Sequence, residues 1–143
     1  MKKLTLFLFI FLMGSIAFAQ QHSPIGTWLN ESGEARIEIY KCDSEKLCGK
    51  IVWLKDPNRD GKPKTDINNP DDKLRSRPIK GMVMMKGFEH DEGNKWDDGE
   101  IYDPKNGKTY SCNMTMLGPD KLEVRGYIGF SMIGRSQKWT RVK

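Results

Sequence analysis

The sequence predicts an all-β protein whose eight strands form an antiparallel up-and-down barrel with one long loop. The first observation is the alternation of apolar and polar residues, typical of half-buried strands, at residues 35–40, 110–116 and 122–125. The second is that short turns rich in Gly, Pro, Asn and Asp separate most of the strand-like runs. The third is size, because strands in so short a chain best protect their edges by closing into a barrel.

Residues 1–19 have the pattern of a secretory signal peptide. Lys2 and Lys3 precede an apolar run, and Ala17-Phe18-Ala19 supplies a small-x-small cleavage site. The apolar run is well short of the roughly 20 residues that a spanning helix needs. We therefore expect export, periplasmic or secreted, and no membrane span in the mature chain. Residues 20–143 fit a single barrel domain.

The remaining strands are predicted from apolar runs bounded by turns. They lie at residues 26–30, 47–55, 82–88, 96–102 and 135–142, with turns at 31–33, 103–107 and 118–120.

The chain has three cysteines, and export would bring them to a compartment where disulfides can form. Cys42 and Cys48 flank a short polar segment between two strands, so they face each other across a hairpin at a distance that a disulfide spans. A bridge closing so small a loop contributes about 2 kcal/mol. Cys112 lies among alternating apolar residues, which predicts a buried free thiol.

The composition and the absence of common motifs reduce the number of function classes that fit the sequence. The 24 Lys and Arg are interspersed with 19 Asp and Glu, which argues against a nucleic-acid partner. The sequence has no G-x-S-x-G, no H-E-x-x-H and no phosphate-binding glycine loop, and neither histidine is near a cysteine at zinc-ligand spacing. We expect a protein that is not an enzyme and that uses no cofactor or metal.

The long loop spans residues 56–78 and is broken by Pro57, Pro63, Pro70 and Pro78. Its first part, DPNRDGKPKTD, alternates acids and amides like a calcium loop. However, a strand precedes it and Ile67 stands where the bidentate Glu belongs, so a turn with Gly61 at positive φ is predicted instead. Further on, we expect one short helical turn with Asn69 as its N-cap.

Two arginines of this loop, Arg75 and Arg77, are candidates for a site at the barrel rim. They suit an anion, or an intramolecular clamp with the acidic residues of the segment 97–100.

The interior of the barrel is the predicted ligand site. Tyr110, Met114 and Met116 share one face of their strand, and if Trp139 points inward, Arg135 and Gln137 do too. The candidate ligand-binding residues are therefore Arg135, Gln137, Tyr110, Met114, Met116 and Trp139. Apolar walls with an arginine suit a small amphipathic or apolar ligand carrying a carboxylate or phosphate. Two alternatives stay open: a barrel simply filled by these side chains, and a cell-envelope protein that docks a protein partner through the 56–78 loop.

The two ends of the predicted barrel carry Gly26-Thr27-Trp28 and Trp139-Thr140-Arg141. In an up-and-down barrel the first and last strands pair, so Trp28 and Arg141 are expected to stack and close the base as structural residues. This combination resembles the lipocalin-like, or calycin, architecture.

A longer series of motifs resembles one family of exported bacterial proteins, domain-of-unknown-function family 2147. The matching segments, in order, are 26–28, 48–54, 66–70, 75–78, Gly81, 101–104, 107–110, 125–129 and 134–141. The resemblance implies an exported lipocalin-like barrel and no particular activity. The family often has a cysteine where this chain has Lys80, and if that cysteine pairs near Cys112 in relatives, the partner is missing here.

Overall fold

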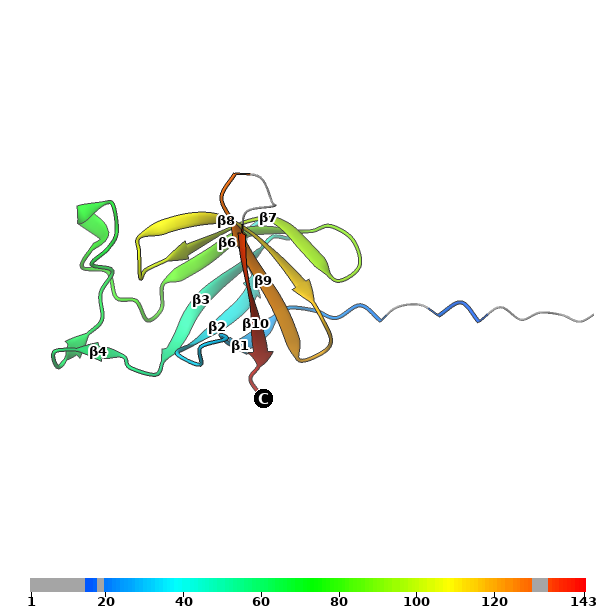
Figure 1. Ribbon diagram of the computed structural model, residues 1–143, viewed down its shortest axis with the longest axis horizontal. Coiled ribbons are helices and arrows are strands. Elements are labelled where there is room, and N and C mark those ends of the chain that lie inside the picture. The colour runs from blue at the N-terminus through cyan, green and yellow to red at the C-terminus, as the bar shows by residue number, and fades with distance from the viewer. Residues whose placement is uncertain (1–14, 18–19, 130–133) are drawn as a thin grey trace, which may run out of the picture.

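The computed structural model describes residues 15–17, 20–129 and 134–143, and in them eight strands close into one antiparallel barrel (Figure 1). The order around the barrel is β1-β10-β9-β8-β7-β6-β3-β2. Their bounds are β1 Gly26–Leu29, β2 Ala35–Lys41, β3 Leu47–Leu54, β6 Val83–His90, β7 Lys95–Asp103, β8 Lys108–Met116, β9 Lys121–Tyr127 and β10 Gly134–Arg141. The predicted all-β barrel is confirmed, and all eight predicted strands agree with these bounds to within two residues at each end. Most of the predicted signal peptide lies outside the described residues.

The barrel has two different ends. The base carries the N-terminal segment and the turns 42–46, 91–94 and 117–120, and β10 ends there. The mouth carries the turns 30–34 and 104–107 and the long connection between β3 and β6. Figure 1 shows this connection reaching out beyond the strands, on the opposite side of the barrel from the segment that leads into β1. In the described part of the chain, no helix is long and apolar enough to cross a bilayer.

Trp28 and Arg141 close the base, as predicted. They are paired residues of β1 and β10, and the Arg141 guanidinium lies 4.3 Å from the centre of the Trp28 ring. The same guanidinium donates hydrogen bonds to the carbonyls of Ser23, Ile25 and Pro119, at 2.7, 2.9 and 2.8 Å. The N-terminal segment and the 117–120 turn are therefore tied to the last strand.

The base half of the barrel is filled by side chains. Met114, Met116 and Trp139 are all buried in the core, together with Cys112. Two buried glycines are required by this packing: a Cβ at Gly49 would lie 2.9 Å from Met85 Sδ, and one at Gly99 would overlap the Phe88 ring. Close packing of this kind leaves no room for a ligand near these glycines.

The cysteine predictions are confirmed. Cys42 and Cys48 form a disulfide with 5.7 Å between their Cα atoms, across the hairpin that joins β2 and β3. Cys112 is free and buried, and burial raises the pKa of its thiol to about 12.

In the long connection, the predicted turn with Gly61 at positive φ and the predicted short helical turn are both present, and the strands that flank the turn were not predicted. β4 (Asn58–Arg59) and β5 (Lys62–Pro63) form a small hairpin, with Asp60 and Gly61 at its turn at φ 51° and 75°. A 3₁₀ helix follows at Asp72–Leu74. Its N-cap is Asp71, so the prediction of Asn69 as the cap is wrong; the Asn69 side chain instead accepts a hydrogen bond from the Asp71 amide at 2.8 Å.

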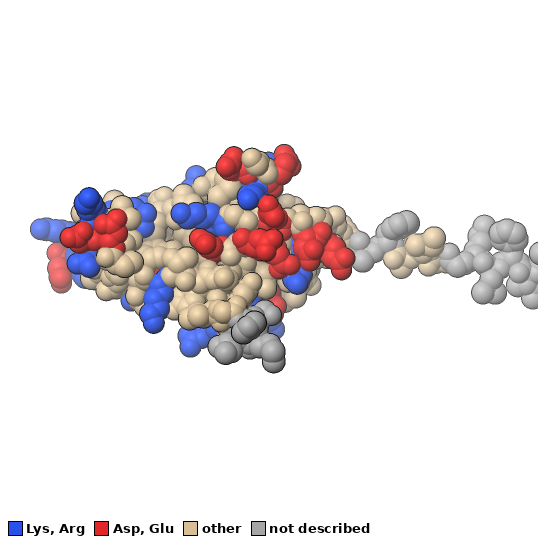
Figure 2. Space-filling view, turned by 90° about the horizontal axis from the view of Figure 1, so that it is seen from above, with Lys and Arg blue, Asp and Glu red and all other residues tan. Residues whose placement is uncertain are grey.

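The surface carries charges of both signs. On the face shown in Figure 2, basic and acidic residues mix at the end formed by the long connection, and acidic residues gather over part of the barrel.

Candidate functional site

The inner face of β10 carries two polar side chains that are exposed to solvent. Gln137 is paired with Val124 and Trp139 with Leu122 across β10 and β9. Directly opposed residues of antiparallel strands point to the same face, and Val124, Leu122 and Trp139 are buried in the core. Gln137, and Arg135 two residues before it, therefore face inward, as predicted, yet both are exposed.

The reason is the length of β1. Only Trp28 and Leu29 of β1 pair with β10, opposite Arg141 and Thr140. At Asn30 the chain turns away, because its side chain accepts hydrogen bonds from the amides of Glu34 and Ala35 at 2.9 and 3.1 Å. Within the described residues, the first half of β10 pairs only with β9. In the part of the chain that the structure describes, no strand pairs with β10 on the β1 side at Arg135 and Gln137.

A glycine leaves room between the polar groups of this region. Gly126 of β9 is paired with Arg135 of β10 on one side and Cys112 of β8 on the other. A Cβ at Gly126 would meet Tyr110 at 3.6 Å and Ile101 at 3.7 Å, both ordinary contact distances. Tyr110 is half-buried, and its hydroxyl accepts a hydrogen bond from Asn106 at 2.9 Å. We call Tyr110, Gly126, Arg135 and Gln137 the inner-face site.

The six residues predicted to bind a ligand thus fall into two groups. Arg135, Gln137 and Tyr110 lie toward the mouth and are at least partly accessible. Met114, Met116 and Trp139 are buried, although the Trp139 indole donates a hydrogen bond to the Gln137 amide oxygen at 3.0 Å. Gly126 was missed; its place opposite a polar, inward-facing residue is visible only once the strand register is known.

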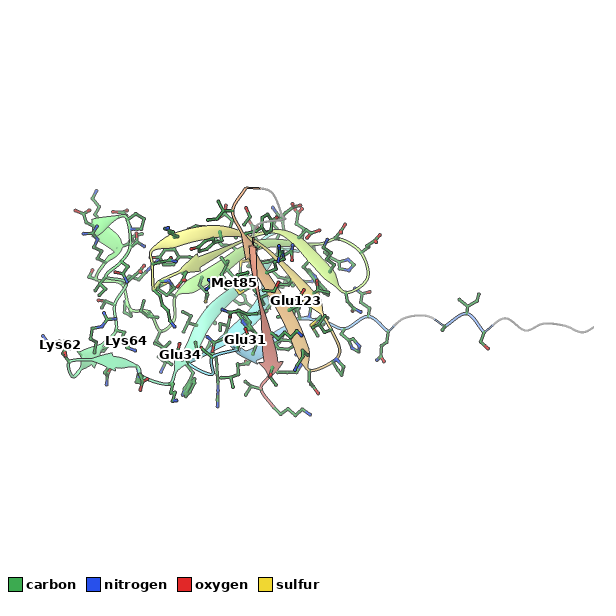
Figure 3. All side chains as sticks on the ribbon, viewed as in Figure 1. Glu31, Glu34, Lys62, Lys64, Met85 and Glu123 are labelled. Carbon is green, nitrogen blue, oxygen red and sulfur yellow. A yellow bond between two sulfur atoms is a disulfide. The ribbon has the colours of Figure 1, made fainter. Side chains whose placement is uncertain are left out.

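A hollow of ≈ 320 Å³ lies at the mouth beside the long connection. Apolar residues Ala35, Leu54 and Ile79 line it, together with Arg59 and Lys64 of the long connection. Lys105 Nζ lies 2.6 Å from Glu34 Oε2 in its wall, and this ion pair joins the 104–107 turn to the start of β2. Figure 3 shows Lys64 between the β4–β5 hairpin and the barrel, with Glu34 on the barrel side and Lys62 at the outer tip. We call this the rim hollow.

The pKa of the Glu34 carboxyl is lowered. The largest cause is the hydrogen bond from Lys105, followed by the one from Ser32, and the positive charges of Lys105 and Lys64 add to it. Glu34 is therefore a carboxylate at neutral pH, and Lys105 neutralises it.

The long connection is anchored to the barrel by one buried carboxylate. Asp66 is 0% exposed and accepts hydrogen bonds from Tyr102 of β7 at 2.7 Å and from Asn69 and Arg77 at 2.8 Å each. Burial acts to raise the pKa of Asp66, but these bonds outweigh it and the pKa is lowered. The Asn68 amide adds hydrogen bonds to the carbonyls of Pro104 and Lys105, at 3.1 Å each.

The predicted clamp between Arg75 or Arg77 and the segment 97–100 is not formed among the described residues, and Arg77 binds an acid of its own loop instead. Arg77 pairs with Asp66 at 2.8 Å, whereas Asp97 of the 97–100 segment pairs with Lys95 at 3.5 Å. The Arg75 Nε donates to the carbonyl of Asn69 at 2.9 Å. Both arginines contribute to the internal structure of the loop. Among the described residues, no group of three or more His, Cys, Asp or Glu is arranged to hold a metal ion.

Comparison with known proteins agrees with this architecture. One solved structure, described as "Protein HP1028 from the human pathogen Helicobacter pylori belongs to the lipocalin family", matches with a TM-score of 0.76 and 21% sequence identity, over 85% of this chain and 84% of that one. At this identity the likeness shows the fold, which is lipocalin-like. No curated protein matches the chain. The model of the family "Uncharacterized protein conserved in bacteria (DUF2147)" matches residues 26–141, and the chain therefore belongs to this family.

Proposed function

We propose that this protein is an exported, non-catalytic binding protein that holds a small amphipathic molecule at the inner-face site. The observation that carries the proposal is that Arg135 and Gln137 face inward but remain exposed, in the half of β10 that, among the described residues, pairs only with β9. A guanidinium in such a position is a ready partner for a carboxylate or phosphate. Lipocalin-like barrels of eight strands are large enough to hold one small ligand, which fits the proposal.

The surroundings of Arg135 define the class of ligand. Ile101, which is partly buried, offers apolar surface, and Tyr110 and Gln137 offer hydrogen-bonding groups. A ligand with an apolar body and one anionic group matches this combination, because pockets pair apolar walls with a few placed polar groups. The packed base limits how deeply the apolar body enters.

Export and lack of catalysis rest on separate evidence. The signal-peptide pattern of residues 1–19 supports export, and the Cys42–Cys48 disulfide is typical of an oxidising compartment. The absence of the common nucleophile and metal motifs from the sequence supports a binding role over an enzymatic one.

Titration with a fluorescent fatty acid tests the proposal. Wild-type protein should bind it, and Arg135→Ala should weaken binding about tenfold or more, the value of one charge-assisted hydrogen bond. Lys138→Ala is the matched control, because it removes an exposed positive charge from the opposite face of the same strand. Failure of the wild type to bind, or equal weakening by the two variants, would contradict the inner-face site.

A second candidate function is docking of an envelope protein by the long loop. It is favoured by the anchoring of the loop through Asp66 and by two exposed apolar side chains, Ile67 at 49% and Leu74 at 38%. A photo-crosslinking residue at Leu74 should give a discrete adduct in envelope extracts. The same residue at Lys121, on the barrel wall, should not; identical adducts from both positions would exclude this function.

A further inference from the structure

We propose that the rim hollow is a second binding site, for a small organic anion, with Lys64 and Arg59 as the groups that hold the anion. This site is separate from the inner-face site and does not depend on it. The two sites draw on different segments, since the rim hollow is built from the β1–β2 turn, the end of β3, the 104–107 turn and the long connection.

The size and floor of the hollow suit an organic molecule. Its volume of ≈ 320 Å³ is at the lower end of the range for small-molecule pockets, about 300–1,000 Å³. Ala35 and Leu54 pack against the core and Ile79 belongs to it, so the floor is apolar and continuous with the packed interior. An apolar floor favours a ligand with a hydrocarbon part over a bare inorganic ion.

The charges around the hollow leave a positive surplus. Its lining contains the cations Arg59, Lys64 and Lys105 and the carboxylates Glu34 and Asp56. Lys105 and Glu34 neutralise each other at 2.6 Å. Arg59 and Lys64 then face Asp56 alone, which favours a ligand with one negative group.

Lys64 is held on a fixed backbone. Its amide donates to the Pro57 carbonyl at 2.9 Å, and its carbonyl accepts from the Ile79 amide at 3.0 Å. Two residues later, Asp66 ties the same stretch to Tyr102 of the barrel wall at 2.7 Å. The backbone that carries the anion-binding group is therefore positioned before a ligand arrives, which reduces the entropy lost on binding.

An NMR titration of the full protein with octanoate tests this site directly. Octanoate should shift the amide signals of Lys64, Thr65 and Ile79. Inorganic phosphate should act at least about tenfold more weakly, because it gains nothing from the apolar floor. Phenyl phosphate distinguishes a phosphate ester from a carboxylate as the preferred group: tighter binding than octanoate would assign the site to phosphate esters, and weaker binding to carboxylates.

Matched variants separate this site from the inner-face site. Lys64→Ala should weaken the response of Thr65 and Ile79 about tenfold, the effect of losing one charge-assisted hydrogen bond. Lys73→Ala, on the exposed 3₁₀ helix of the same loop, and Arg135→Ala should leave it unchanged. Absence of any octanoate response at Thr65 and Ile79, an unchanged response in Lys64→Ala, or phosphate binding as tight as octanoate would overturn the proposal. Fatty-acid binding that Arg135→Ala leaves unchanged, with the octanoate response of Thr65 and Ile79 intact, would contradict only the inner-face site.

Discussion

Gln137 and Val124 are directly opposed on β10 and β9 and point to the same face, yet Val124 is 4% exposed and Gln137 is exposed to solvent. The pair marks the level at which the interior changes from packed to open. Below it, Leu122 and Trp139 are both buried; above it, Gly126 faces Arg135. The interior becomes accessible where the pairing of β1 with β10 ends. The short first strand therefore accounts for the exposure of the inner-face site.

Filling the space at Gly126 should block the inner-face site. The φ of Gly126 is not in the left-handed region, and a Cβ there would make only ordinary contacts, so Gly126→Ala should fold and bind normally. Gly126→Leu should fold but lose fatty-acid affinity by about tenfold or more, because its side chain occupies the space beside Arg135. Melting curves and fluorescence titrations measure the two effects. Equal affinity of the Leu and Ala variants would show that a ligand does not use this space.

Removing the charge of Asp66 should loosen the long connection. Asp66→Asn leaves Arg77 and Tyr102 without their carboxylate partner, which should cost about 2–3 kcal/mol of unfolding free energy. Urea unfolding at pH 7 measures this cost. Asp72→Asn is the control: Asp72 is exposed on the same loop, and its change should stay within about 0.5 kcal/mol. Similar values for the two variants would mean that the anchor contributes no special stability.

The same network predicts how stability depends on pH. The folded pKa of Asp66 is lowered from its ordinary 3.8, so its contribution is present above that value and is lost as pH falls through the folded pKa. The pKa of Tyr102 is raised to about 12, by burial and then by its hydrogen bond to Asp66, so its contribution is present below pH 10 and is lost as pH rises toward 12.

Unfolding curves of wild type and Asp66→Asn across the pH range check this. Their difference in free energy should be constant near neutral pH and shrink in acid below about pH 4. A difference that grows in acid would contradict the lowered pKa. At alkaline pH, the unfolding free energy of wild type should begin to decline near pH 10, and the Tyr102→Phe variant should lack this part of the decline.

The sequence predicts the strands well because alternation and turn chemistry are local. Tyr110 and Met114 share a face by spacing alone, and Trp28 meets Arg141 because an up-and-down barrel pairs its first and last strands. The anchor of the loop is not local. Asp66 and Tyr102 are far apart in the chain, and nothing in the segment 56–78 distinguishes Asp66 from the other acids before the fold brings them together.

Of the inner-face site, the sequence predicts the local feature, which is the direction of the side chains, and not their exposure. Strand parity places Arg135 and Gln137 inward from the sequence, but whether they are buried depends on where β1 ends. That point is set by the turn at Asn30, whose side chain takes the hydrogen bonds that a longer strand would leave to the backbone. The rim hollow depends on three connections and the end of β3, and could not be predicted from any one of them.

Replacing Arg141 with alanine should lower the unfolding free energy more than replacing it with lysine, because the contacts of the guanidinium at the barrel base depend on more than its charge. The guanidinium stacks on Trp28 at 4.3 Å and donates to three carbonyls, those of Ser23, Ile25 and Pro119. Arg141→Lys keeps the charge but loses the planar fork, so it should recover only part of the roughly 2–4 kcal/mol that Arg141→Ala costs. Urea unfolding measures the stability of both variants, and tryptophan fluorescence reports the environment of Trp28. A lysine variant as stable as wild type would mean that charge, and not the fork that joins the N-terminal segment to the 117–120 turn, holds the base closed.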